Sequence, residues 1–234
     1  MLLTPPFILG QAAPAPPQTY TGSMGGGIAL TGGNTDTKNS NLTFNLVRDP
    51  KTRNVIKASA AYLRGNQNHV NTLDRTAFNL RDEYTISGRT FTFGQVDYLR
   101  DKFKQIIFLW APVAGVGYKL INTDSTKFAI DGGAGGLLER NPGKAVSKSG
   151  SVTTGENLQQ KLSSTATFTE SVATLWKTND FADSLTNFSA GLTTSILRKL
   201  DIKFEFIDSY KNKPPTVLVK KNDTAFVTTL VVKF

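Results

Sequence analysis

Charged and polar side chains recur at every second position of several segments, and these are the residues that could do chemistry. In residues 72–85, Arg75, Arg81 and Glu83 share one face with Asn79. Carboxylates on a common face are the groups that general acid–base catalysis uses. Here they are interleaved with Arg and Lys, so we interpret them as an ion-pair ladder. The candidate residues of this polar face are Arg75, Asn79, Arg81, Glu83, Asp97, Lys119, Asp131, Lys203 and Glu205.

Other chemistries lack the residues that they need. The chain has one histidine, His69, and no cysteine, so we expect no transition-metal site, no thiol catalysis and no cofactor. The glycine clusters 25–27, 32–33 and 132–136 do not lie between a strand and a helix, so they are not phosphate-binding loops. We interpret them as strand kinks, tight packing and hairpin turns.

These polar residues lie on segments that are predicted to be β-strands. Asn39–Val47 is typical: Leu42, Phe44 and Leu46 alternate with polar residues. An alternation of period two over about ten residues predicts a strand long enough to cross a bilayer. The same pattern predicts twelve strands, with ten or fourteen as alternatives, at residues 20–31, 38–47, 54–63, 72–85, 90–100, 106–120, 127–139, 150–162, 165–176, 184–197, 200–210 and 223–234.

The links between these segments alternate in kind. Short turns are predicted at 48–53, 87–89, 122–126, 162–165 and 198–200, and longer links at 32–37, 64–71, 101–105, 140–149, 177–183 and 211–222. Short periplasmic turns and longer outer loops are typical of bacterial outer-membrane barrels. The sequence therefore predicts an all-β, transmembrane, antiparallel up-and-down barrel of a Gram-negative-type outer membrane, with both termini periplasmic. In such a barrel the apolar faces meet lipid and the polar set faces the lumen.

Charge and composition agree with this architecture. The net charge of +9 is spread over turns and alternate strand positions, without a basic helix or tail, so we expect no nucleic-acid partner. Outer-membrane lipids are the expected neighbours, and basic outer loops could meet lipid phosphates or stay simply solvated.

The two ends of the sequence carry separate signals. Residues 1–18 resemble the end of a secretory signal peptide followed by a Pro-rich linker, although no basic residue precedes Lys38; a disordered Pro-rich arm is the alternative. The barrel domain is expected at 19–234. The last strand ends on an aromatic residue, with apolar residues at alternate positions before it, which predicts a signal for the barrel-assembly machinery: Phe226, Leu230, Val232 and Phe234.

Several segments together resemble one family. They are GGGIALTGGNTDTKNSNL, FTFGQVDYLRDKF, AGVGYKLINTDSTKFAIDGGAGG and YKNKPPTVLVKKNDTAFVTTLVVKF, and they extend from about Gly25 to Phe234. This pattern is similar to the domain of unknown function 481 family, whose members are often labelled salt-induced outer membrane proteins. The resemblance implies an outer-membrane β-barrel. The family has no established enzymatic residues, so none is carried over, and its label describes expression rather than mechanism.

The sequence leaves three functions open. The first is a narrow, porin-like channel for ions or small polar solutes, lined by the polar face. The second is a structural or envelope-stress barrel that transports nothing. The third is an outer-membrane lipid hydrolase, which would need His69 as its base; the segment around His69 is a poor place for a preorganised triad, so we expect no enzyme. The link 140–149 separates the first two, since it would plug the lumen if it folded inward.

Overall fold

The computed structural model describes residues 19–32, 37–67 and 70–234. Within these ranges the chain forms twelve strands that close into a barrel. The strands are β1 (Tyr20–Gly32), β2 (Thr37–Arg48), β3 (Asn54–Gln67), β4 (Val70–Thr85), β5 (Thr90–Asp101), β6 (Ile106–Asn122), β7 (Thr126–Arg140), β8 (Ser147–Lys161), β9 (Ala166–Lys177), β10 (Asp180–Leu197), β11 (Leu200–Lys211) and β12 (Asn222–Lys233).

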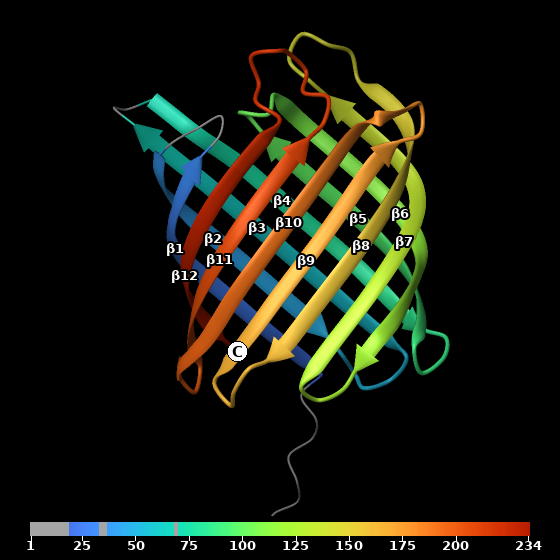
Figure 1. Ribbon diagram of the computed structural model, residues 1–234, viewed down its shortest axis with the longest axis vertical. Coiled ribbons are helices and arrows are strands. Elements are labelled where there is room, and N and C mark those ends of the chain that lie inside the picture. The colour runs from blue at the N-terminus through green and yellow to red at the C-terminus, as the bar shows by residue number, and fades with distance from the viewer. Residues whose placement is uncertain (1–18, 33–36, 68–69) are drawn as a thin grey trace, which may run out of the picture.

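Every strand pairs antiparallel with its neighbours in the sequence, and β1 pairs with β12 to close the barrel (Figure 1). Gly22 and Phe234 exchange two backbone hydrogen bonds of 3.0 Å, which continue this seam to the last residue. Closure satisfies the backbone groups that an open sheet would leave unpaired in lipid. The predicted twelve-stranded up-and-down barrel is therefore confirmed.

The barrel has two distinct ends. One end carries the short turns between β2 and β3, β4 and β5, β6 and β7, β8 and β9, and β10 and β11, together with Phe234; we call it the turn end. The opposite end, the loop end, carries the links 141–146 and 212–221, which stand above the strands in Figure 1. Lys102–Gln105, which joins β5 to β6, also lies at the loop end.

The outer surface of the barrel is apolar. Ile28, Leu42 and Phe226 are 67%, 53% and 47% exposed, although each is large and hydrophobic. Because side chains alternate along a strand, the residues between them face the lumen. The described residues form no helix that is long and apolar enough to span a membrane. An apolar outer band with a polar interior is the arrangement of a transmembrane barrel.

Three predicted links are wrong in extent, because the strands beside them continue further than expected. The strand β8 begins at Ser147, so the link predicted at 140–149 shrinks to residues 141–146. The link predicted at 64–71 shrinks to the pair 68–69, because β3 extends to Gln67 and β4 begins at Val70.

The link predicted at 177–183 is only the pair 178–179, because β10 begins at Asp180. A register shift between Asp180 and Ser184 lets this polar segment continue the strand. A polar segment therefore does not indicate a loop in such a barrel, because a strand that borders a polar lumen also carries polar residues.

Glycine permits close packing on one inner wall. The rings of Phe91 and Phe93, both less than 5% exposed, occupy the space that a side chain at Gly117 or Gly115 would fill. The rings therefore lie flat against the facing strand instead of projecting into the lumen. The sequence did not single out Gly115 or Gly117, but Gly133 of the predicted cluster 132–136 packs against the same Phe93 ring.

The lumen as candidate functional site

Arg81 is the centre of a charged network on the inner wall. Its Nε donates to Glu83 at 2.8 Å, and one terminal nitrogen lies 2.8 Å from a carboxylate oxygen of Asp131. The other terminal nitrogen donates to Gln95 Oε1 at 2.7 Å. The guanidinium also lies 3.8 Å from the ring centroid of Phe93, a cation–π contact. Register places Arg81 opposite Gln95 of the neighbouring β5, whereas Asp131 lies on β7, with β5 and β6 between, and is reached by the long Arg81 side chain on the inner face.

The network continues to both sides of Arg81. Gln95 donates to Asp97 at 2.6 Å, and Asn79 donates to the other carboxylate oxygen of Asp97 at 2.7 Å. Towards the turn end, Lys57 contacts Glu83 at 2.7 Å. We call the connected set of Lys57, Asn79, Arg81, Glu83, Gln95, Asp97 and Asp131 the wall network. Because every member has a partner of opposite charge or matching polarity, the network holds its own geometry.

The remaining predicted lumen residues lie outside this network. Lys203 and Glu205 form a pair of 2.8 Å on β11, and Lys119 lies 5.9 Å from the ring centroid of Phe91. Arg75 lies 4.0 Å from Asp101 and donates across the lumen to Asn187 at 3.4 Å. The structure thus places the candidates on the inner face and joins Asn79, Arg81, Glu83, Asp97 and Asp131 in the wall network. Their use as a pore lining stays a prediction.

Sequence reasoning missed a segment that crosses the lumen. Lys102–Gln105, which we call the strap, leaves β5 and reaches the opposite wall, where Lys104 Nζ donates to the carbonyl of Ser209 at 2.9 Å and lies 3.3 Å from Asp223. Strands β5 and β11 lie on opposite sides of the barrel, so this contact spans its mouth. Lys104 is only 1% exposed.

The conformation of the strap is fixed locally. The carboxylate of Asp101 accepts hydrogen bonds from the backbone nitrogens of Phe103 and Lys104, and the carbonyl of Gln105 accepts one from Asn141. Burial lowers the pKa of the Lys104 ammonium from its ordinary value, while the facing carboxylate of Asp223 opposes that fall. Docking of the strap therefore has a desolvation cost that its ion pair offsets in part.

An apolar layer surrounds the strap at the loop end of the lumen. Leu99, Leu109 and Leu137 project from one wall and Leu185 from β10, and all four pack into one buried cluster. Phe103 of the strap packs against a second cluster, which contains Leu63 and Val227. With the strap, these side chains form what we call the plug: Leu63, Leu99, Phe103, Lys104, Ile106, Leu109, Ala111, Leu137, Leu185 and Val227.

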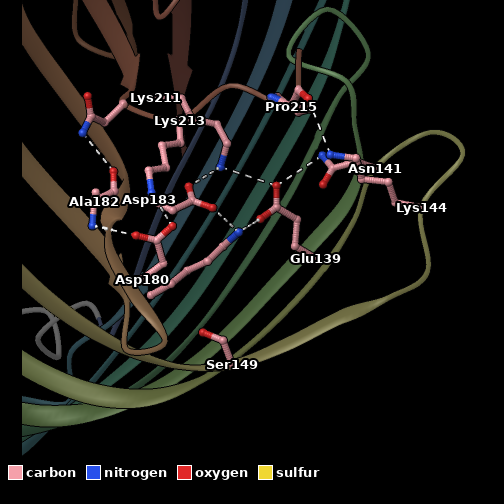
Figure 2. A network of polar contacts seen from close by, with 12 residues as sticks. Glu139, Asn141, Lys144, Ser149, Asp180, Ala182, Asp183, Lys211, Lys213 and Pro215 are labelled. Atoms are coloured by element: carbon pink, nitrogen blue, oxygen red, sulfur yellow. Dashed lines mark hydrogen bonds and ion pairs between the residues drawn. The ribbon is translucent and has the colours of Figure 1, made fainter. Parts of the chain in front are cut away.

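Buried ion pairs complete the plug on the side of β7 to β11. The carboxylate of Glu139, 1% exposed, lies 2.6 Å from Lys177 Nζ and 3.5 Å from Lys211 Nζ. Asp183 contacts both lysines from β10 (Figure 2). The link 141–146 curves away from this network, and Lys144 on it donates to the carbonyl of Pro215. The plug is thus built mainly by the strap and the strand ends, while the link that the sequence singled out contributes Asn141, which donates to Gln105 and Glu139.

The turn-end half of the lumen is different, because its inward side chains reach water. Asn157 and Gln159 on β8 face the lumen and are exposed. The side chain of Lys57 is 45% exposed, although it lies on the inner wall. The lumen of the described residues is therefore wet towards the turn end and packed at the loop end.

The remaining residues that the sequence singled out lie away from the lumen. Phe226, Leu230, Val232 and Phe234 all lie on the outer face, and their role as an assembly signal stays a prediction. His69 and residues 1–18 lie outside the described residues. Within the described ranges, no group of three or more His, Asp or Glu side chains is placed to hold a metal ion.

The sequence matches one family over residues 25–234, described as protein of unknown function, DUF481. The chain belongs to this family. The match extends from the middle of β1 to Phe234, so the DUF481 region includes the wall network, the strap and the plug. No curated protein matches the sequence significantly.

Solved structures share the fold of this DUF481 barrel at low sequence identity. The NanC porin is 10% identical, with a TM-score of 0.60, over 92% of this chain and all of that one. An outer membrane channel from Pseudomonas putida F1 is 11% identical, with a TM-score of 0.54, over 96% and 100%. The translocator domain of the autotransporter NalP from Neisseria meningitidis is 10% identical, with a TM-score of 0.54, over 93% and 89%. The fold is that of outer-membrane barrels.

Proposed function

We propose that this protein is an outer-membrane channel for ions or small polar solutes, closed at its loop end in this conformation. The observation that carries the proposal is the contrast within one lumen. Exposed polar side chains and solvated charges line the turn-end half, while the plug fills the loop end. We propose that the turn end, which carries the short turns, faces the periplasm.

The turn-end half has the properties of a narrow conduit. Its wall carries both signs of charge, with Arg81 and Lys203 beside Glu83 and Glu205. Rings of fixed charge and polar groups replace part of the hydration of a passing ion. Because the two signs are balanced along this wall, we expect weak selectivity between anions and cations.

The plug has the properties of a gate. An apolar constriction in a narrow pore excludes water and so blocks ions. The strap is four residues long, and its attachment to the opposite wall consists mainly of the contacts of Lys104. Withdrawal of the strap recovers the desolvation cost of burying Lys104 but loses its contacts with Ser209 and Asp223, and we propose that the closed form is reversible.

A barrel that transports nothing is the second candidate. The plug favours it, because Leu137, Ile106 and Lys104 are each 1% exposed, which is the packing of a permanent core. Removal of the strap distinguishes the two candidates. A gate then leaves an open pathway, whereas a permanent core keeps the barrel closed or unfolds it. We propose that the protein is not an enzyme under either candidate.

The test is the conductance of refolded protein in a planar bilayer. In the variant, Asn-Gly replaces Lys102–Gln105 and joins Asp101 to Ile106 with the tight turn that this dipeptide favours. The proposal expects rare openings for the wild type and frequent, longer openings for the variant. The matched control shortens the outward link at residues 142–146 instead and keeps Asn141, which donates to the strap, and we expect it to behave as the wild type does.

Folding is checked by the shift in gel mobility that intact barrels show before heating. Silence from a folded strap variant would overturn the channel and leave the non-transporting barrel. Equal activation by the control would show that the strap is not the gate.

A further inference from the structure

A cluster of basic residues lies on the outer face of the barrel at the loop end. Arg64 on β3 stands opposite Asp74 on β4, and Arg100 on β5 contacts the same carboxylate through two bonds of 3.0 and 3.3 Å. Lys102, which is exposed, donates its backbone N–H to the carbonyl of Asp74. Asp74 thus has one arginine paired with its carboxylate, a second arginine opposite it on β3, and Lys102 joined to its backbone, all at the outer face.

The cluster has more positive than negative charge, and part of it is exposed. The side chain of Arg100 is 43% exposed although it is paired with Asp74. The side chain of Arg64 is exposed and has no partner among the described side chains. Asp74 neutralises one of the three positive charges, so the cluster keeps an excess of about two.

The depth of the cluster is that of lipid head groups. Each arginine has a tyrosine on the same face of its strand, two residues closer to the turn end. Tyr62 precedes Arg64 on β3, and Tyr98 precedes Arg100 on β5. Tyr98 contacts Trp110 of β6 with ring centroids 4.9 Å apart. Aromatic side chains in this position mark the boundary of the apolar band, so the arginines one step beyond it lie among head groups.

Several other cations at the loop end are not available in this way. Lys177 and Lys211 point inward and pair with Glu139 and Asp183. Lys104 is buried in the strap. On β11 the corresponding outward position is occupied by an acid, Asp208. Arg140 and Lys148 are also exposed at the loop-end termini of β7 and β8, so the cluster over β3 to β5 is distinguished by its two arginines beside one carboxylate and not by being the sole outward positive charge.

We infer that Arg64, Arg100 and Lys102 form a binding site for the phosphate of a membrane lipid head group. Guanidinium groups bind phosphate through two parallel hydrogen bonds, and the aromatic side chains below contact the adjoining acyl chains. Asp74 holds Arg100 in place and also repels the phosphate, so it limits the affinity of the site. The inference is independent of whether the lumen conducts.

The test is a titration of the full-length refolded protein in neutral detergent, followed by native mass spectrometry. The probes are a glycolipid with two phosphates, lipid A, and the same lipid with its phosphates removed. Arg64→Gln/Arg100→Gln should weaken the binding of lipid A by about tenfold or more, since each charged hydrogen bond to phosphate is a strong one. Removal of the phosphates should weaken wild-type binding to a similar extent. Asp74→Asn should tighten the binding of lipid A severalfold.

The matched control, Arg48→Gln/Arg89→Gln, removes the same charge at the turn end and should leave the affinity unchanged. An equal loss in this control, equal affinity for both probes, or weaker binding by Asp74→Asn would overturn the site. Displacement of lipid A by millimolar inorganic phosphate would assign the site to free phosphate and overturn the inference that it binds a lipid head group. If the double arginine variant does not fold, the wild-type comparison of the two probes and Asp74→Asn still decide the question.

Discussion

The plug and the turn-end half of the lumen are built from the same alternating strands but have opposite contents. In the plug the inward positions carry leucines, and the charges among them are buried and paired, as Glu139 and Lys211 are. In the turn-end half the inward positions carry charges that keep contact with water, as Lys57 and Lys203 do. Closure of the barrel therefore fixes which residues face inward, while residue type at each depth fixes whether the lumen is dry or wet.

The energetic meaning of an ion pair differs between the two regions. A buried charge that loses its partner is left without water, whereas a half-exposed one regains its hydration. The same substitution should therefore have a large effect in the plug and a small one on the wall. Three matched pairs of substitutions follow in order of decreasing expected effect: the first tests this difference, the second tests the packing of the plug, and the third tests the packing of the turn-end wall.

Glu139→Gln should destabilise the barrel by about 3–5 kcal/mol, because it leaves the charges of Lys177 and Lys211 buried with only Asp183 to balance them. The comparison is Glu205→Gln, whose partner Lys203 has a side chain 31% exposed. This second change should cost less than about 1 kcal/mol. Urea titration followed by gel mobility measures both. Equal losses would show that the plug is as hydrated as the wall.

Leu185→Ala should cost about 2–4 kcal/mol, because it leaves a cavity in the cluster that joins the two sides of the lumen. Leu230→Ala removes the same atoms from the outer face, where the leucine is 48% exposed and lipid can fill the space. We expect a loss of about 1 kcal/mol or less at that position. A similar loss at both positions, measured by the same urea titration, would contradict a packed plug.

Gly117→Ala tests the packing of the turn-end wall. A methyl group there overlaps the ring of Phe91, so the ring must move, at a cost of about 1–3 kcal/mol. Gly94 has open space around its missing side chain, and Gly94→Ala should change the stability by less than about 1 kcal/mol. If neither change alters the stability in urea unfolding, the rings of Phe91 and Phe93 are loosely packed. The turn-end half would then lack a tightly packed wall around its hydrated lumen.

The fold could be predicted from the sequence because its pattern is periodic and local. Alternation such as that of Leu42, Phe44 and Leu46 fixes a strand and both of its faces at once. The polar candidates reached the inner face for the same reason. Register between β4 and β5 places Asn79 opposite Asp97 and Arg81 opposite Gln95, whereas the contact of Arg81 with Asp131 on β7, beyond β5 and β6, does not follow from register between neighbouring strands.

The plug could not be predicted, because its contacts join parts of the chain on opposite walls. The strap sequence Lys102–Gln105 is polar and short, and whether it points inward depends on the carbonyl of Ser209 on the far side of the barrel. The link 140–149 attracted attention through its length, yet length does not determine direction. One signal was available: Leu99, Leu109 and Leu137 occupy inward positions at the loop end, where the pattern otherwise places polar residues.

In this structure the lumen is open to water from the turn end and sealed at the loop end. The chain has no cysteine, so a single cysteine can report this directly. Asn157→Cys lies on the wet wall, and Ser209→Cys, at a position that is 0% exposed, lies in the plug. In sealed vesicles of known orientation, a membrane-impermeant thiol reagent should label the cysteine at 157 quickly from the turn end alone and the cysteine at 209 from neither side. Equally fast labelling at 157 from the loop end would show a continuous lumen and contradict the account.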